Sequence, residues 1–395
     1  MRYPPDRAGI TRWASMVSLA ASLAASLAAW SLLASCDHSK PAAHPETAAI
    51  AEVRPKSAED ETLARGPNGE PAVRASQVAI DAADVEKVRA LQARAVMLWA
   101  GSGEWYTAIT AGAQAEFTRL GVRVVSKADA QFDPARQATD VETSLALKPD
   151  IMLALLVDPV SAARAFQPAV DAGVTLVFAD NGADGYQAGK QCSAIVTGDQ
   201  FGMGREAARL LSEALGGRAP IGYIYHDARF FVTNNRDREF KRTVLSRYPG
   251  LKIVAEAGFS QENKTEEVAA AMLIQHPEVK GIYVAWDVAA EGVVAALRAA
   301  GRYDVKVVTH DLGATNDLDM VMDGNVCAKV ADRPFEIGET MARVAALRLI
   351  GKPVPPFIVT PSFAMDKRTV AEGWQQTLHK APPSILLKAL ARQRS

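Results

Sequence analysis

The feature that most constrains the fold is an alternation of short apolar runs with longer helical segments, which begins at residue 95. The runs are rich in β-branched residues and bounded by Gly or Pro, and the segments between them are Ala-rich and amphipathic. Such alternation predicts an α/β protein in which helices cover both faces of a parallel sheet. The strands expected first are 95–100, 122–126, 150–157, 175–180 and 193–199, with helices at 105–119, 135–147 and 159–172.

The pattern starts again after residue 200, which predicts a second sheet. A single eight-stranded barrel is the alternative, but it would need no such restart. The chain has 395 residues, 49% of them hydrophobic, which suits two domains of ordinary size. The second series of strands is expected at 221–227, 252–259, 281–287, 305–311 and 325–332, with helices at 234–247, 263–275, 288–300 and 335–350.

The N-terminal segment is typical of an export signal. Three Arg and one Asp precede an uncharged, Ala- and Leu-rich run from Ala14 to Ser35. A basic region followed by an apolar region is the layout of a signal peptide. The apolar run is also long enough to span a bilayer, so an uncleaved membrane helix is the competing interpretation.

The residues Leu33-Ala34-Ser35-Cys36 resemble the bacterial lipobox, in which the Cys is lipidated and becomes the first mature residue. This motif predicts a signal peptide over 1–35 and a lipid anchor on Cys36. Residues 36–92 are rich in Ala, Pro, Glu and Lys, and most of them show no apolar period, so we expect a flexible tether. Within it, residues 81–92 are expected to form a helix that leads into the fold.

Aromatic residues, Asp and Gly gather at the carboxyl ends of the predicted strands, where doubly wound sheets bind ligands. Trp105 and Tyr106 stand side by side where a strand gives way to a helix. Neighbours on a helix point about 100° apart, so a pure core role would use only one of them well. A core role alone therefore does not account well for both residues, although a core pair remains one interpretation.

Several stretches in a consistent order resemble the type I periplasmic binding proteins of the ribose and pentose/hexose class. These are AITAGAQAEFTRLG, LVDPVSAARAFQPAVDAGVTLVFADN, TGDQFGMGREAARLL, NNRDREFKRTV, VAWDVAAEGVVAALRAAG, VVTHDLG and ADRPFEIGETM. The resemblance implies two Rossmann-like, doubly wound lobes joined by a three-strand hinge, with ligand bound between them. Lobe one would comprise 93–198 and 333–360, and lobe two 199–332 and 361–395.

The resemblance also implies which side chains contact the ligand. Aromatic residues at the Trp105-Tyr106 position stack on the apolar face of a sugar ring, which is physically sound because an aromatic plate removes that face from water. Asp180 and Asp311 match carboxylates that accept hydrogen bonds from sugar hydroxyls. Arg236 matches an arginine that can serve two hydroxyls and also neutralise Asp180.

The sequence departs from the ribose-binding pattern at other positions. Asn181 replaces an arginine, Trp286 replaces an asparagine, and Asp332 stands near a position usually held by glutamine. We predict that all three contact a ligand other than ribose, or one held in a different pose, with Trp286 as a second stacking plate. Several carboxylates around one arginine also fit an amine-bearing or metal-assisted ligand. Asp287 is expected to be the N-cap of the following helix.

Neither catalysis nor a cofactor or metal is predicted. The pairs His226-Asp227 and His310-Asp311 lack supporting ligand spacing and are expected to be structural. No G-x-S-x-G elbow or phosphate-binding loop of the Walker type occurs in the sequence. Cys192 and Cys327 would lie in different lobes, and a disulfide needs Cα atoms within about 7 Å, so they are expected not to pair.

The expected function follows from the resemblance and the N-terminus together. The chain would be a monomeric, lipid-anchored solute-binding protein of the periplasm or cell envelope, delivering a sugar or polyol to the permease of an ABC importer. A sensor that feeds a receptor kinase or chemoreceptor is the alternative. A repressor core is disfavoured by the export signal, a hydrolase by the missing motifs, and nucleic acid as a partner by the net charge of −1.

Overall fold

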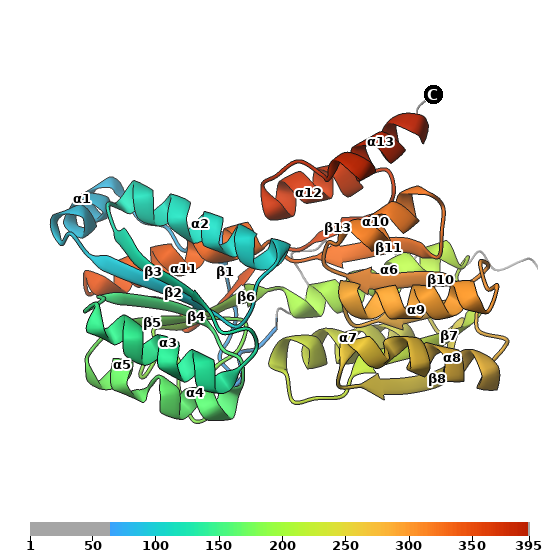
Figure 1. Cartoon of the computed structure of the whole chain (residues 1–395), viewed down its shortest axis with the longest axis horizontal. Coiled ribbons are helices and arrows are strands. Elements are labelled where there is room, and N and C mark those ends of the chain that lie inside the picture. The colour runs from blue at the N-terminus through green and yellow to red at the C-terminus, as the bar shows by residue number, and fades with distance from the viewer. Residues whose placement is uncertain (1–63, 394–395) are drawn as a thin grey trace, which may run out of the picture. The chain divides into compact units, whose positions relative to one another are not determined.

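Two sheets of mainly parallel strands form the framework of the protein (Figure 1). The computed structural model describes residues 64–393. The first sheet has the strand order β1-β12-β6-β5-β4-β2-β3, and each neighbouring pair is parallel. Its strands are β1 (Val73–Arg74), β2 (Arg94–Trp99), β3 (Arg123–Asp129), β4 (Ile151–Leu155), β5 (Thr175–Ala179), β6 (Ala194–Gly198) and β12 (Phe357–Thr360).

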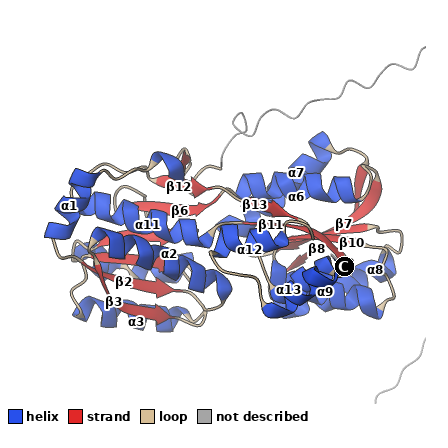
Figure 2. Ribbon diagram, turned by 90° about the horizontal axis from the view of Figure 1, so that it is seen from above, coloured by secondary structure: helices blue, strands red, loops and turns tan. Residues whose placement is uncertain are grey.

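The second sheet has the order β13-β11-β10-β9-β7-β8. Its strands β13, β11 and β10 are labelled in Figure 2. Only β13 runs antiparallel to its neighbour among these six strands. The strands are β7 (Ala219–His226), β8 (Leu251–Phe259), β9 (Gly281–Val284), β10 (Lys306–His310), β11 (Val326–Ala331) and β13 (Phe363–Met365). We call each sheet with its helices a lobe. Two sheets rather than one closed barrel confirm the predicted fold class.

Helices connect the strands nearly as the periodicity predicts. The expected helix at 159–172 is interrupted at Phe166. Lobe one has α1 (Ala82–Ala90), α2 (Glu104–Leu120), α3 (Pro134–Ala146), α4 (Pro159–Ala165), α5 (Gln167–Asp171) and α11 (Pro334–Leu349). Lobe two has α6 (Gln200–Ala214), α7 (Phe231–Arg247), α8 (Thr265–Gln275), α9 (Asp287–Ala299), α10 (Ala314–Val321), α12 (Val370–Leu378) and α13 (Ser384–Gln393).

Both faces of each sheet are buried, which explains the unbroken apolar runs in the sequence. In lobe one, Met97 packs into the core with Phe117 of α2, whereas the next residue, Leu98, packs on the opposite face with Phe166. Successive strand residues point to opposite faces, so each strand must be apolar throughout. Helices α2 and α11 cover one face of the sheet, and α3, α4 and α5 cover the other (Figure 1).

Helices α2 and α11 approach each other closely because each presents a glycine to the other. A Cβ at Gly112 would collide with the backbone of Phe335, and one at Gly338 would collide with the backbone of Ile109. Only glycine permits such an approach of two helix backbones. This contact fixes α2, whose first turn carries Trp105, against the helix that follows the second crossing between the lobes.

The described chain crosses between the two sheets three times: between β6 and α6, between β11 and α11, and between β12 and β13. Asp332 lies in the second of these crossings, directly after β11. The first and second crossings leave the carboxyl ends of β6 and β11. Both therefore lie at the edge where ligands bind in such sheets.

The expectation of a flexible tether over 36–92 is wrong for its last part. Strand β1 pairs with β12, and Val88 of α1 is fully buried in the core of lobe one. The helix expected at 81–92 is confirmed, with the Asp81 carboxylate capping it at Asp84 N (2.8 Å). The sparse apolar residues of this segment find partners on lobe one that its own sequence does not reveal. The predicted signal peptide, Cys36 and the start of the tether lie outside the described residues.

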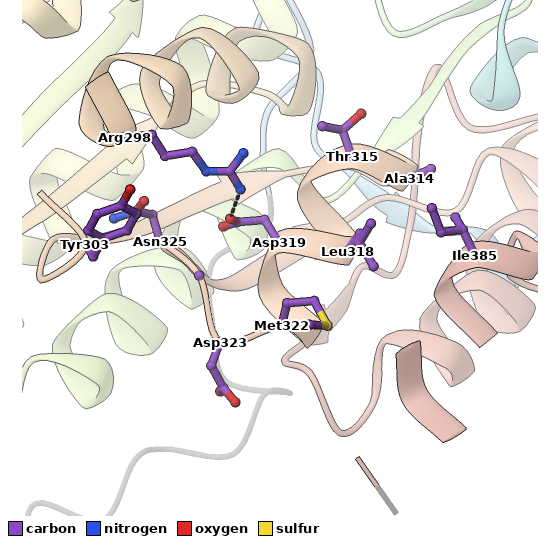
Figure 3. A pocket seen from close by; sticks show the side chains of 11 residues that line it. Arg298, Tyr303, Ala314, Thr315, Leu318, Asp319, Met322, Asp323, Asn325 and Ile385 are labelled. Atoms are coloured by element: carbon purple, nitrogen blue, oxygen red, sulfur yellow. Dashed lines mark hydrogen bonds and ion pairs between the residues drawn. The ribbon is translucent and has the colours of Figure 1, made fainter. Parts of the chain in front are cut away.

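The C-terminal helices α12 and α13 pack on lobe two. Trp374 of α12 is buried, and α13 lies beside α10. A pocket of about 600 Å³ opens where these elements meet, lined by residues that include Leu318, Met322 and Ile385 (Figure 3). None of the predicted ligand residues lines it. Across residues 64–393, none of the helices combines the length and apolarity needed to cross a membrane.

Candidate ligand-binding site

Asp180 and Asp311 occupy equivalent places in the two lobes. The orders β6-β5-β4-β2-β3 and β11-β10-β9-β7-β8 correspond strand by strand, and the two residues directly follow the equivalent strands β5 and β10. Both adopt left-handed backbone conformations, with φ of 59° and 64°. Asp tolerates this region better than most residues, and such conformations cluster at functional sites. The fold thus sets a carboxylate at the carboxyl edge of each sheet.

Asp180 is buried and takes its hydrogen bond from a neighbouring strand end. Thr197 Oγ1 donates to Asp180 Oδ1 at 2.8 Å, and Gln200 Nε2 donates to the same hydroxyl at 3.5 Å. Gln200 is the first residue of α6 and is also buried, and its Oε1 has no hydrogen-bond partner. The sequence analysis missed Thr197 and Gln200, although both follow the rule that applies to the other strand ends.

Arg236 of α7 supplies the guanidinium that interacts with all three carboxylates, Asp180, Asp311 and Asp332. Its Nη1 donates to Asp311 Oδ2 at 3.3 Å, and its side chain is only 6% exposed. Its Nε is buried without a hydrogen-bond partner. The expected neutralisation of Asp180 by Arg236 is therefore not a direct ion pair, because the arginine contacts the carboxylate of its own lobe.

Trp105 links lobe one to the crossing between the lobes. Its Nε1 donates to both carboxylate oxygens of Asp332, at 3.0 and 3.1 Å. Gly103, with φ of 123°, forms the turn that starts α2, a backbone conformation that L side chains rarely adopt. The Trp105 and Tyr106 rings meet edge to face, with centroids 5.2 Å apart, and both remain partly exposed.

Three carboxylates interact electrostatically around this one guanidinium. Burial raises the pKa of Asp180 to about 6, and the charge of Asp311 adds to the rise. Burial also raises the pKa of Asp332 well above its usual range, with Asp311 and Asp180 as further causes. The pKa of Asp311 is raised by burial as well, against the opposing effect of Arg236. These couplings place Asp180 of lobe one, Asp311 of lobe two and Asp332 of the crossing in one group.

The two histidines at strand ends have structural partners, as predicted. His226 Nδ1 lies 2.8 Å from Thr233 Oγ1, and burial, with the charge of Arg236, lowers its pKa. His310 is fully buried between Val330 O and the Tyr283 hydroxyl, and burial lowers its pKa well below the usual value. Both imidazoles are therefore neutral at pH 7.

Trp286 packs against one of these two histidines, His226. Its ring meets His226 edge to face at 4.9 Å, and its Nε1 donates to Glu262 Oε2 at 3.0 Å. Its role as a second stacking plate stays a prediction.

The expectation that Asp287 caps α9 is wrong. Trp286 is the N-cap residue and makes no side-chain cap bond. The Asp287 carboxylate instead receives Lys329 Nζ at 2.5 Å, and the same ammonium donates to Asp317 at 2.7 Å. Lys329 is fully buried, and a buried ammonium without a partner would destabilise the fold by more than the loss of one helix cap. Asp287 therefore pairs with Lys329 instead of capping α9. Trp374 Nε1 completes the cluster by donating to Asp317 at 2.8 Å.

Of the predicted ligand residues, the structure brings six together through hydrogen bonds, ring contacts or electrostatic interactions: Trp105, Tyr106, Asp180, Arg236, Asp311 and Asp332. Asn181 follows Asp180, is 1% exposed, and has neither amide atom hydrogen-bonded. Phe132, which sequence reasoning missed, has φ of 56° and meets the Tyr106 ring edge to face at 6.3 Å. It is 65% exposed, an unusual state for a large aromatic in a left-handed turn.

Within residues 64–393, no group of three or more His, Cys, Asp or Glu side chains is arranged to hold a metal ion. Cys192 is buried in lobe one and Cys327 lies on β11 of lobe two, and both thiols are free. The prediction that these two cysteines do not pair is confirmed.

Comparison with known proteins gives consistent matches. Residues 94–353 match the periplasmic binding protein domain family. The ribose import binding protein of Escherichia coli (strain K12) is 25% identical over 279 residues, covering 71% of this chain and 92% of its own. A D-ribose/D-allose-binding protein of Pseudomonas aeruginosa is 30% identical over 233 residues, covering 57% of this chain and 70% of its own.

Solved structures share the fold. An ABC transporter solute binding protein from Agrobacterium vitis, bound with alpha-D-tagatopyranose, has a TM-score of 0.63 at 22% identity, covering 71% of this chain and 96% of its own. A periplasmic ribose ABC transporter protein from Conexibacter woesei has a TM-score of 0.65 at 20% identity, covering 72% and 97%. The family match spans well over half of the chain, and the solved structures share its fold, so this protein belongs to the periplasmic binding protein family and is a binding protein rather than an enzyme.

Proposed function

We propose that the protein captures a sugar or polyol outside the cytoplasm and delivers it to the permease of an ABC importer. The observation that carries the proposal is the interaction of side chains from both lobes and their crossing in one group: Trp105, Asp180, Asp311, Asp332 and Arg236. A ligand that touches both lobes at once stabilises their closed arrangement by its differential affinity for it. Relatives named for ribose and allose import support this class of ligand.

The chemistry of the group suits a hydroxyl-rich ring. The partly exposed Trp105 ring offers an apolar plate for a C–H face. Ionised carboxylates accept hydrogen bonds from hydroxyls, and the guanidinium of Arg236 donates to them. Micromolar affinity requires about 8 kcal/mol, which one stacked face and several charge-assisted bonds can supply after the cost of ordering.

Calorimetric titration tests the proposal directly. The purified protein is titrated with D-ribose, D-allose, D-arabinose, D-tagatose, ribitol and glycerol, and at least one is expected to bind with a micromolar dissociation constant. Arg236→Met should weaken that binding by roughly 30-fold or more, because the bonds of a buried, charged donor are lost. Arg368→Met is the matched control, since this arginine is 82% exposed. Equal affinity of the Arg236 and Arg368 variants would contradict the assigned site.

The lipid anchor is part of the same proposal and rests on the sequence alone. Cells expressing the wild-type chain should hold it in the membrane fraction, with a mass that includes acyl groups on a new N-terminal Cys36. Cys36→Ser removes the thiol that carries the lipid and should prevent both processing and acylation. An unmodified mass for the wild-type protein would remove the anchor from the proposal without affecting sugar capture.

A further inference from the structure

The site contains more acidic than basic side chains, and this excess of carboxylates indicates the class of ligand. Asp180, Asp311 and Asp332 contribute three carboxylates, whereas Arg236 contributes the guanidinium that they share. Arg236 forms its ion pair with Asp311. Asp180 is bonded to the hydroxyl of Thr197, and Asp332 to the indole of Trp105, both neutral donors.

The groups packed around this set do not restore the balance. Lys329 is held between Asp287 and Asp317, a cluster that itself carries one excess negative charge. Asp237 is buried and bonded to the Tyr283 hydroxyl at 2.6 Å, and burial raises its pKa to about 6. His226 and His310 have lowered pKa values, because burial and Arg236 disfavour their charged forms. Arg333, which follows Asp332, is paired with Glu336 at 2.6 Å, and Arg205 of α6 is paired with Glu239 at 3.5 Å. Within the described residues, no second cation therefore forms an ion pair with Asp180 or Asp332.

The carboxylates also leave hydrogen-bond acceptors in excess, although the buried side-chain atoms without partners, Gln200 Oε1, Arg236 Nε and both amide atoms of Asn181, are divided between acceptors and donors. An ionised carboxylate can only accept. Gln200 adds a buried acceptor, Oε1, that has no donor, next to the hydroxyl bonded to Asp180. The guanidinium of Arg236, which is 5% exposed, has a buried Nε without an acceptor, so the set also includes a donor available to a hydroxyl. The site therefore calls for a ligand with both hydroxyls and a group that donates several hydrogen bonds.

Building on the proposed function, we propose that the preferred ligand is an amine-bearing polyhydroxy compound, such as an amino sugar or an amino polyol, whose ammonium group lies between Asp180 and Asp332. An ammonium group carries three donors and no acceptor, which matches two carboxylates and one amide oxygen. It also supplies the charge that these buried carboxylates lack, and its bonds to them are charge-assisted. Hydroxyls on the remainder of the ligand meet Arg236 and Asp311.

The test compares ligands that differ in a single group. D-glucosamine is titrated against D-glucose, D-galactosamine against D-galactose, and 1-amino-1-deoxyribitol against ribitol, at pH 6 and pH 7 by calorimetry. At least one amine should bind about tenfold or more tightly than its neutral partner, equivalent to about 1.4 kcal/mol. N-acetyl-D-glucosamine, which keeps the size but loses the charge, should behave like the neutral sugar.

Proton release gives a second, independent readout. The pKa of Asp180 is raised to about 6 and that of Asp332 well above its usual range, so a cation that favours their ionised forms should expel protons into solution. Titrations at pH 6 in buffers of different ionisation enthalpy should show this release with the amine and not with the neutral sugar. Asp332→Asn should remove most of the amine preference, so that the amine and its neutral partner bind this variant within about threefold of each other. Asp323→Asn, at an exposed carboxylate outside the site, is the control.

The outcomes separate the two proposals. Tighter or equal binding of the neutral partner in each pair would overturn the amine assignment and leave sugar capture intact. Neutral-sugar binding that requires added Ca²⁺ and is abolished by EDTA would likewise overturn it. Failure of every amine and every neutral compound to bind would overturn sugar capture itself. Asn variants at either carboxylate remove buried repulsion and should fold, which circular dichroism checks.

Discussion

The two lobes share a strand order and a left-handed aspartate but solve the problem of buried charge differently. In lobe one, Asp180 is paired with a hydroxyl, and the surrounding core is apolar. In lobe two, Asp311 is paired with Arg236, and a lysine, further aspartates and a histidine lie in the interior. The same position after a strand can therefore hold either a carboxylate without a cationic partner or a carboxylate in an ion pair. The residues of the adjoining helix and strands decide which.

The buried lysine provides the largest test of this difference. Lys329→Met leaves Asp287 and Asp317 buried without their cation, which should lower the free energy of unfolding by about 3–5 kcal/mol. Urea unfolding followed by circular dichroism measures the loss. Lys367→Met, which removes an exposed ion pair with Asp323, should cost less than about 1 kcal/mol. Similar costs for the two variants would show that lobe two does not depend on its buried ions.

The pH dependence of stability tests lobe one. The raised pKa of Asp180 means that the folded protein holds this proton more tightly than the unfolded chain does. The contribution of Asp180 is therefore fully present below about pH 4 and declines as pH rises to about 6, by up to about 3 kcal/mol.

Asp180→Asn should remove this decline, which urea unfolding at a series of pH values between 4 and 7 would measure. Asp304→Asn is the control: the bond from Arg302 holds the pKa of Asp304 well below its usual range, so its contribution changes only below about pH 4 and the slope between pH 4 and 7 should stay the same. An unchanged pH slope in the Asp180 variant would mean that this carboxylate is better compensated than its contacts indicate.

Close helix packing is the corresponding source of stability in lobe one. Gly338→Ala forces α11 away from α2, because the added Cβ meets the backbone of Ile109. We expect a loss of about 1–3 kcal/mol in the free energy of unfolding, as for other overpacked contacts. Arg348→Ala, at an exposed position of the same helix, should change it by less than about 0.5 kcal/mol. A neutral Gly338 variant would show that the two helices can separate without cost.

The smallest expected effect concerns the ion pair between Lys380, after α12, and Glu104 of α2. Both side chains are substantially exposed, so Lys380→Ala should lower the free energy of unfolding by less than about 1 kcal/mol. The effect should shrink further in high salt. Thermal unfolding at two salt concentrations measures the effect. A larger loss would mean that the C-terminal segment from α12 to α13 contributes more to stability than its contacts indicate.

Much of the fold could be predicted because apolar period and Gly or Pro punctuation are local signals. The strands and the helix after Asp81 followed from such signals, whereas the prediction of unpaired cysteines followed from the two-lobe resemblance. The packing of residues 64–92 on lobe one could not, since β1 and α1 derive their stability from partners distant in the sequence.

Part of the ligand-binding site could be predicted from the sequence for the same reason. Asp180 and Asp311 could be located because they end apolar runs. The role of Asp287 could not be predicted, because its position at the start of a helix does not indicate that it pairs with a lysine 42 residues away. Thr197 and Gln200 were not predicted because a Gly-rich crossing suggests turns, although Thr197 lies near the end of β6 and Gln200 follows that strand.

The C-terminal tail has a consequence for the populations of lobe arrangements. Besides Lys380, His379 stacks on Phe335 of α11, with ring centroids 3.7 Å apart, so a segment anchored on lobe two also touches lobe one. Together these two contacts amount to about 1–2 kcal/mol, enough to change the ratio of two conformers by roughly 5- to 30-fold. On the proposed mechanism, the fraction of molecules ready to receive a solute is thus set partly by residues that never meet it.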